Sequence, residues 1–279
     1  MNDLQRKELE LFKYFIDICE KLNLKYYLVC GSALGAVKYG GFIPWDDDLD
    51  VALLRPDYEK FIEQASQYLP EHIFLQNYRT DPEYPLLGSK LRDCNTTFIE
   101  PGYVNLNMNQ GIYIDIFPLD GYPDSQEETI KFEKKKKYYE RRRTVATSYN
   151  RWKYITNIRT TTVYVLYKLF GYCKDTAKTM KKYEEMISSY STENSKLFCN
   201  HANWQGVLEY APREQYGDGE IKTFEGIEVR VPQLYDAYLK QKYGDYMKEL
   251  PEEEQVPSHT YIVDVKQPYT YYLKKEKRL

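Results

Sequence analysis

Four acidic residues lie within five positions of the segment GSALGAVKYGGFIPWDDDLDV, which covers residues 31–51. They are Asp46, Asp47, Asp48 and Asp50. Carboxylates at such short spacing repel one another unless a cation compensates their charge. Because hard oxygen ligands suit Mg²⁺ and Mn²⁺, the segment indicates either a divalent-metal site or an acidic loop that faces solvent.

Two of these aspartates fall in a predicted strand, DLDVALL. Asp48 and Asp50 are two residues apart, so in a strand both carboxylates lie on the same face. The alternative for this pair is a strand edge that faces solvent. We expect Asp46 to be a weaker candidate for the outer shell of a metal site, and Asp47 to face solvent.

A third acid, Asp115, stands alone in the apolar segment GIYIDIFPLD. Burying this carboxylate without a partner would be costly, because an ionised group loses its hydration in the protein interior. One interpretation is that Asp115 completes a three-carboxylate metal site with Asp48 and Asp50. The other is that Asp115 forms a buried salt bridge with a lysine or arginine such as Arg92.

The segment before the acids has the order expected of a phosphate site. KYYLVCGS predicts a buried strand that ends in a turn at Gly31 and Ser32, and ALGAVKYGG predicts a short helix. Backbone N–H groups at the N-terminus of a helix bind phosphate readily. Gly31 and Ser32 are therefore expected to contact phosphate groups opposite a metal ion that the acids hold.

This arrangement resembles known enzymes at two levels. A Gly-Ser turn, a D-x-D strand and a later acid are similar to nucleotidyltransferases of the DNA polymerase β type. The closer resemblance is to the LicD family, which includes bacterial phosphocholine transferases and is related to fukutin-type phosphosugar transferases. It is carried by GSALGAVKYGGFIPWDDDLDV, KLRDCNTTFIE, GIYIDIFPLDG and, nearer the C-terminus, FEGIEVRVPQLYDAYLKQKYGDYM. One departure is Lys38-Tyr39, which stands where the family often has Arg-His.

The resemblance implies an α+β (α/β) fold, with a polymerase-β-type nucleotidyltransferase core, a mixed β-sheet and a helical insertion. We divide the chain into three parts. Residues 1–124 form the catalytic core, residues 125–200 form a helical insertion that contacts the acceptor or a membrane, and residues 201–279 pack back on the core.

The resemblance also implies a reaction. A hydroxyl group of the acceptor attacks the phosphorus of a CDP-linked donor, most often CDP-choline, and CMP leaves. The acceptor would be a precursor of a cell-surface glycan, of the lipopolysaccharide, teichoic acid or capsule type, built on a lipid carrier. Alternatives are the same fold with CDP-glycerol, CDP-ribitol or a phosphosugar donor, a nucleotidyltransferase that uses an NTP, and a catalytically inactive binding module.

In this assignment Asp48, Asp50 and Asp115 are the catalytic residues and the ligands of Mg²⁺ or Mn²⁺. Asp115 is in addition a candidate general base for the acceptor hydroxyl. In such an in-line displacement, positioning and neutralisation of charge provide most of the catalysis.

Cationic and aromatic residues complete the expected site. Lys38, Lys90 and Arg92 are expected to neutralise phosphate charge. Lys90 and Arg92 share one face of a predicted strand, and a surface pair is the alternative. Trp45 would stack on cytosine, face choline or pack within the fold. A quaternary ammonium needs aromatic walls, for which the sequence offers Tyr39, Tyr103, Tyr113 and Trp204.

The histidines and one basic stretch each have two interpretations. His72, His201 and His259 lack metal-ligand spacing. Among them His201 is the best candidate to reach a site, although a structural role is favoured. Residues 131–143 hold eight Lys or Arg against two Glu, which indicates either a solvated helix face or contact with an anionic membrane.

Periodicity and punctuation predict the elements that must position these residues. Helices are expected near the N-terminus, through Pro56 to Leu69, after a Ser125-x-x-Glu128 capping box, over about 151–190, and up to Gly244. Further strand candidates are IFLQN, LLGSKLRD, TTFIE and IYIDIF, and FEGIEVRVP predicts a hairpin or an edge strand.

The composition sets the broad class. The chain has 279 residues, 42% of them hydrophobic and 29% charged, with a net charge of −3, so no basic field points to nucleic acid. No apolar run approaches the roughly 20 residues that cross a bilayer, and the charged N-terminus does not resemble a cleavable signal. The five cysteines are widely spaced, which favours reduced thiols. We therefore expect a cytoplasmic enzyme, at the inner face of the membrane if it binds one.

Overall fold

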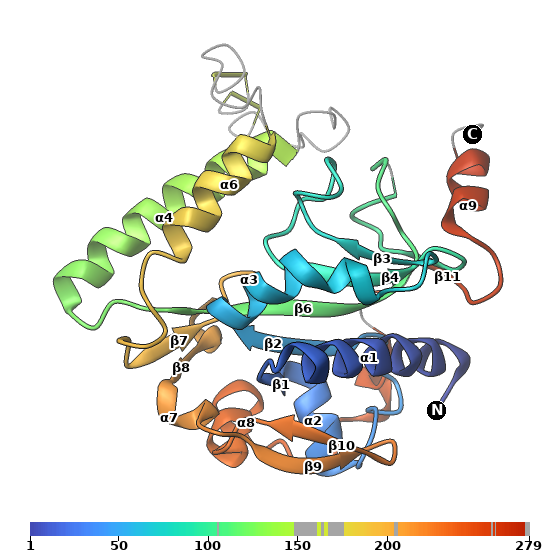
Figure 1. The fold of residues 1–279 in the computed structure, drawn as a ribbon, viewed down its shortest axis with the longest axis horizontal. Coiled ribbons are helices and arrows are strands. Elements are labelled where there is room, and N and C mark those ends of the chain that lie inside the picture. The colour runs from blue at the N-terminus through green and yellow to red at the C-terminus, as the bar shows by residue number, and fades with distance from the viewer. Residues whose placement is uncertain are drawn as a thin grey trace.

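The centre of the computed structural model is a seven-stranded mixed sheet with the order β1-β2-β6-β4-β3, which β7 and β8 extend beyond β6 (Figure 1). The structure describes residues 1–104, 106–147, 161–162, 165–166, 176–203, 206–257, 259 and 261–276. The strands are β1 (Tyr26–Leu28), β2 (Asp50–Leu54), β3 (Ile73–Gln76), β4 (Ser89–Asp93), β6 (Ile112–Gly121), β7 (Leu197–Cys199) and β8 (Tyr210–Pro212). The α+β class is thereby confirmed.

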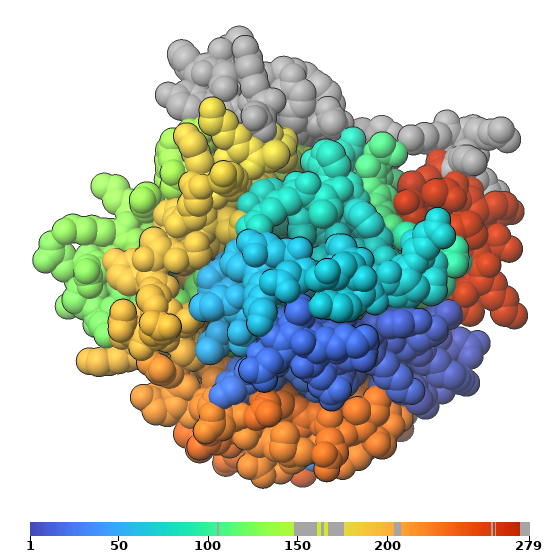
Figure 2. Space-filling view, viewed as in Figure 1, coloured from blue at the N-terminus to red at the C-terminus, as the bar shows by residue number. Residues whose placement is uncertain are grey.

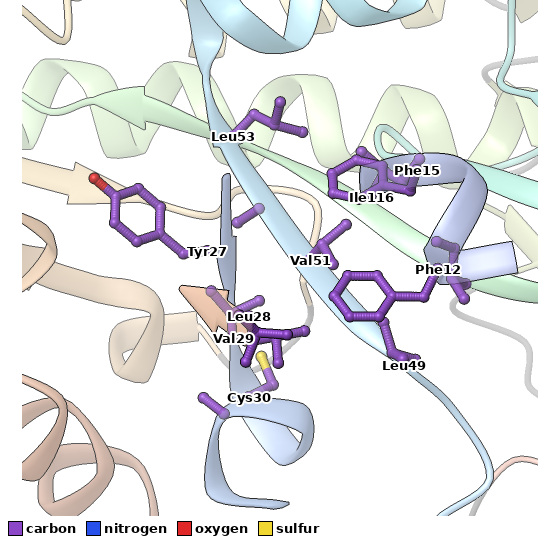
Figure 3. Packing of buried hydrophobic residues seen from close by; sticks show 14 of the residues in the cluster. Phe12, Phe15, Tyr27, Leu28, Val29, Cys30, Leu49, Val51, Leu53 and Ile116 are labelled. Atoms are coloured by element: carbon purple, nitrogen blue, oxygen red, sulfur yellow. The ribbon is translucent and has the colours of Figure 1, made fainter. Parts of the chain in front are cut away.

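Helix α1 (Asp3–Leu22) covers one face of this sheet. A capping box between Asn2 and Gln5 begins the helix. Phe12 and Phe15 project from α1 towards β2 and β6, where they meet residues such as Val51 (Figure 3). Both phenylalanines are fully buried, and each burial stabilises the fold by roughly 1.5–3 kcal/mol. The space-filling view shows α1 lying between the segment that follows β2 and the C-terminal part of the chain (Figure 2).

Helix α2 (Cys30–Lys38) begins directly after β1. Gly31 and Ser32 therefore lie in the first turn of this helix. Our prediction that they form a separate turn between the strand and the helix is wrong. Gly35 is required by a close approach, because a Cβ atom there would lie 2.4 Å from the carbonyl oxygen of Gly41. Helix α3 (Arg55–Gln64), with a proline in its first turn as predicted, leads into the 3₁₀ turn η1 (Ala65–Tyr68).

Helices α4 (Gln126–Thr147) and α6 (Thr176–Ile187) pack together and project from one side of the sheet (Figure 1). The serine half of the predicted capping box is present, since Ser125 Oγ accepts a hydrogen bond of 3.3 Å from the backbone N–H of Glu128. A second apolar cluster around Phe132 and Tyr183 joins these helices to the sheet. Most of the helical region predicted over 151–190 lies outside the described residues.

The C-terminal part of the chain returns to the strands near α2. It contains η3 (Gly206–Glu209), α7 (Arg213–Tyr216), the hairpin of β9 (Glu220–Phe224) and β10 (Ile227–Val231), α8 (Tyr235–Tyr243), η4 (Glu252–Glu254), β11 (Ile262–Asp264) and α9 (Tyr269–Glu276). The hairpin contacts β1 and α2, and β11 pairs with β5 (Thr97–Ile99). Both the predicted hairpin and the helix end at Gly244, which has a φ of 64°, are confirmed. Among the described helices, none combines the length and apolar character that crossing a bilayer requires.

Candidate functional site

The carboxylates of Asp48, Asp50 and Asp115 converge where β2 begins. In the parallel pairing of β2 with β6, Asp50 lies opposite Asp115. One carboxylate oxygen from each of the three residues lies within 4.8 Å of the other two. Asp48 precedes β2 rather than lying in it, so the predicted strand began too early. The carboxylate of Asp48 nevertheless reaches those of Asp50 and Asp115. We call these three residues the acid site.

Burial dominates the electrostatics of the acid site. It raises the pKa of Asp48 to about 6 and that of neighbouring Asp46 to about 8, the latter with a further contribution from the charge of Asp48. Burial also raises the pKa of Asp50 and of Asp115, although Lys90 opposes the shift at Asp115. Without a compensating cation, these carboxyl groups therefore stay protonated at pH values at which carboxyl groups in water are ionised.

Glu8 of α1 adds another carboxyl group to this region. Its side chain is fully buried, and neither of its oxygens has a hydrogen-bond partner among the described residues. Burial and the nearby charge of Asp48 raise the pKa of Glu8 well above its ordinary value. An excess of buried carboxyl groups, all of them hard oxygen donors, is the environment that Mg²⁺ or Mn²⁺ fits.

Lys90 is the cation nearest to Asp115. Its Nζ lies 3.1 Å from Asp115 Oδ2, 3.8 Å from Glu100 Oε2 and 3.3 Å from the centre of the Tyr113 ring. The buried salt bridge that we considered for Asp115 is thus present, with Lys90 instead of Arg92 as its partner. It coexists with the convergence of the three carboxylates, so the two interpretations of Asp115 do not exclude each other.

Arg92 lies deeper in the same strand and exposes no surface. Its guanidinium donates hydrogen bonds to Gln76 Oε1 and to the carbonyl oxygen of Gly111, and it covers the Tyr113 ring at 4.7 Å. The alternative interpretation, that Lys90 and Arg92 form a pair on the protein surface, is therefore wrong. The buried position of Arg92 also contradicts the expected phosphate contact, and it indicates support of the sheet. Because two cations cover the ring of Tyr113, that ring is not open to choline.

The first turn of α2 lies against the acids. Ser32 Oγ accepts a hydrogen bond of 2.8 Å from the backbone N–H of Asp50 and is buried. A Cβ atom at Gly31 would lie 2.8 Å from Asp46 Oδ2, so only glycine lets this carboxylate approach the helix. Contact of Gly31 and Ser32 with a donor phosphate stays a prediction.

Lys38 contacts the C-terminal part of the chain, and Trp45 contacts Tyr39. Lys38 Nζ lies 3.2 Å from Glu249 Oε1 and donates a hydrogen bond of 3.0 Å to the carbonyl oxygen of Lys248. Trp45 packs edge to face on Tyr39, with 6.3 Å between ring centres. Their roles towards a nucleotide stay predictions, and Trp204 lies outside the described residues.

His259 reaches the acid site, which the sequence did not indicate. Its Nδ1 lies 3.1 Å from Asp47 Oδ1 and 3.3 Å from Asp48 Oδ2, and its backbone N–H donates to Asp47 Oδ2 at 3.0 Å. The hydrogen bond to Asp47 raises the pKa of His259 to about 9. Asp47 is only 2% exposed, so our expectation that it faces solvent is wrong. No local pattern signals a contact that spans 212 positions.

His201 has the structural role that we favoured. It is buried against the rings of Tyr122, Phe132 and Tyr210, and its Nδ1 lies 3.3 Å from Cys199 Sγ. Burial lowers the pKa of His201 to about 3, so the ring is neutral at physiological pH.

Comparison with known proteins gives three similarities. A family model described as "LicD/FKTN/FKRP, nucleotidyltransferase domain" matches residues 23–149. The chain is 30% identical over 259 residues to the lipopolysaccharide cholinephosphotransferase LicD of Haemophilus influenzae, which covers 90% of this chain and 92% of that relative. Over 48 residues it is 38% identical to the ribitol 5-phosphate transferase FKRP of mouse and human, which covers 17% of this chain and 10% of those relatives.

Proposed function

Because the chain belongs to the LicD family, we propose that it transfers phosphocholine from CDP-choline to a hydroxyl group of a lipopolysaccharide-type glycan precursor, releasing CMP. The observation that carries this proposal is the 30% identity that extends over 92% of a lipopolysaccharide cholinephosphotransferase. In the reaction, the acceptor oxygen forms a bond to the phosphorus of phosphocholine. The bond from that phosphorus to the bridging oxygen breaks, and CMP keeps the electron pair.

The acid site supplies the residues for this displacement. Asp48, Asp50 and Asp115 would hold Mg²⁺ or Mn²⁺, which supplies neutralisation of the diphosphate charge when bound. Asp115 is proposed to accept the proton of the acceptor hydroxyl. Lys90 supports this role, because its ammonium group holds Asp115 Oδ2 and so fixes the orientation of the carboxylate.

The experiment that tests the proposal is calorimetric titration with CDP-choline, CDP-ribitol, CDP-glycerol and CTP, with and without Mg²⁺. We expect Mg²⁺-dependent binding of CDP-choline, followed by transfer of labelled phosphocholine to lipopolysaccharide, and loss of transfer in Asp48→Asn. Selective binding of CTP with release of pyrophosphate would instead identify a nucleotidyltransferase.

A second donor has specific support. The short match to ribitol 5-phosphate transferases covers 48 residues, and it makes CDP-ribitol the first competitor to examine. Preference for CDP-ribitol over CDP-choline in the same titration would keep the reaction type and change the transferred group.

We also propose that helix α4 rests on the anionic inner face of the membrane that carries the acceptor. Lys134, Lys137 and Arg141 are exposed and recur at the spacing of one helix face, opposite Phe132 and Lys136, which are buried. These three cations form no ion pair with the described part of the chain. Reversing all three charges to glutamate should weaken flotation with anionic vesicles by about 100-fold or more, since each cation contributes roughly 1 kcal/mol. Equal flotation of both proteins would refute this contact.

A further inference from the structure

His259 and Asp47 form a pair next to the acid site that the proposed reaction does not yet use. Two groups of His259 bind Asp47, since Nδ1 lies 3.1 Å from Oδ1 and the backbone N–H lies 3.0 Å from Oδ2. Both carboxylate oxygens of Asp47 are thereby engaged. The same Nδ1 lies 3.3 Å from Oδ2 of Asp48. Because two carboxylate oxygens, which can only accept, lie within 3.3 Å of Nδ1, that nitrogen carries a proton.

The His259 side chain lies beside the acid site and is partly exposed to solvent. It is 37% exposed, whereas the side chain of Asp47 is 3% exposed and that of Asp48 is 14% exposed. Asp47 is therefore covered, while His259 and Asp48 stay within reach of a molecule that enters from solvent.

The chain holds His259 in place from both directions. After it, the backbone N–H of Tyr261 donates to the carbonyl oxygen of Ile99, and β11 continues this pairing with β5. Before it, Glu249 binds Lys38 and Tyr39 at the end of α2. The backbone on both sides of His259 is therefore anchored to the rest of the fold, and the contact with Asp47 orients the imidazole.

We propose that His259 is a positioning residue of the acid site, which fixes the carboxylate of Asp48 for binding a divalent cation. The ion-pair contact of 3.3 Å between Nδ1 and Asp48 Oδ2 comes from outside the ligand set and restricts the rotation of this carboxylate, so less entropy is lost when a cation binds. Asp47 acts through His259: it holds the imidazole in the orientation that reaches Asp48. This inference rests on the metal site of the proposed function and adds two residues to it.

The test measures metal affinity directly, without the transfer reaction. Apo protein is titrated with Mn²⁺ by calorimetry for the wild type, His259→Ala, His259→Asn and Asp47→Asn. His72→Ala is the matched control, because His72 lies in the turn just before β3 and contributes nothing to the acid site in our assignment. The His259→Asn variant keeps a side-chain N–H donor near the position of Nδ1, and thermal unfolding of each protein checks that the fold is retained.

We expect His259→Ala to bind Mn²⁺ 10–100-fold more weakly than the wild type, as is typical when a ligand loses its outer hydrogen-bond partner. His259→Asn should recover most of that loss, Asp47→Asn should fall between them, and His72→Ala should match the wild type. A purely structural role predicts a lower unfolding temperature with unchanged Mn²⁺ affinity.

Equal affinity of His259→Ala and the wild type overturns the positioning role and leaves the metal site standing. If His259→Ala does not fold, the comparison of His259→Asn with Asp47→Asn decides. Mn²⁺ binding that is equally weak in these two variants overturns the positioning role, because the N–H donor that His259→Asn retains then has no effect on the affinity. Absence of Mn²⁺ binding in the wild type overturns the metal site and the positioning role together.

Discussion

Replacing His201 by phenylalanine should remove one identifiable part of the acid sensitivity of this protein. In the folded chain, burial lowers the pKa of His201 to about 3, while an unfolded histidine has a pKa of about 6.5. Below pH 6.5 the unfolded chain therefore binds a proton at this residue that the folded chain does not bind. Folding stability falls as the pH falls through this range, and the loss grows until the pH reaches the folded value.

The size of the effect follows from the two pKa values. Between pH 8 and pH 5, protonation of this one residue in the unfolded chain costs about 2 kcal/mol of folding free energy. In the His201→Phe variant this contribution is absent. Any packing cost of the larger ring among Tyr122, Phe132 and Tyr210 is the same at both pH values, so it cancels in the comparison.

The assay is urea unfolding at pH 8 and pH 5, followed by far-ultraviolet circular dichroism. We expect the wild type to lose about 2 kcal/mol more than His201→Phe between these pH values. Transfer activity of His201→Phe at pH 8 should stay near that of the wild type. The same pH dependence in both proteins would refute the reasoning, because it would mean that His201 accepts a proton inside the fold.

Three further predictions concern the sheet and the acid site. Asp120→Ala should lower the unfolding free energy by about 1.5–3 kcal/mol in urea, because it removes both hydrogen bonds of 2.7 Å that Arg55 donates to the fully buried Asp120, while Arg55 keeps its ion pairs with Glu59 and Glu184. Equal stability of Asp120→Ala and the wild type would contradict this reasoning. Gly35→Ala should cost about 1–3 kcal/mol in the same assay, since its Cβ meets the carbonyl oxygen of Gly41 at 2.4 Å. Asp50→Asn should abolish stabilisation by Mg²⁺, which for the wild type is about 2.7 kcal/mol at 100 times Kd, and equal thermal shifts would contradict it.

Elements with a local signal could be predicted from the sequence. The helix that ends at Gly244 and the β9–β10 hairpin follow from turn chemistry and periodicity, which act over a few residues. The convergence of Asp50 and Asp115 could also be anticipated, because a lone acid in an apolar strand needs a partner, and parallel neighbours supply one.

Contacts between distant segments could not be predicted in this way. Nothing near Asp47 indicates that His259 covers it, since the pairing depends on how the C-terminal part of the chain returns across the sheet. Strand periodicity placed Lys90 and Arg92 on one face, but it could not tell that this face is buried beneath other elements. Periodicity assigns side chains to faces, whereas burial depends on which elements later pack there.

The parallel pairing of β2 with β6 has a consequence for how the protein folds. Residues 55–111 separate the two strands, so a long loop must close before Asp50 and Asp115 meet. Asp48 and Asp50 are neighbours in the nascent chain, but the third carboxylate joins them only after this closure. If the pairing forms after the folding transition state, a cation bound to all three slows unfolding and leaves the folding rate unchanged. Such a cation would protect the finished enzyme kinetically, and it would give no help in reaching the native state.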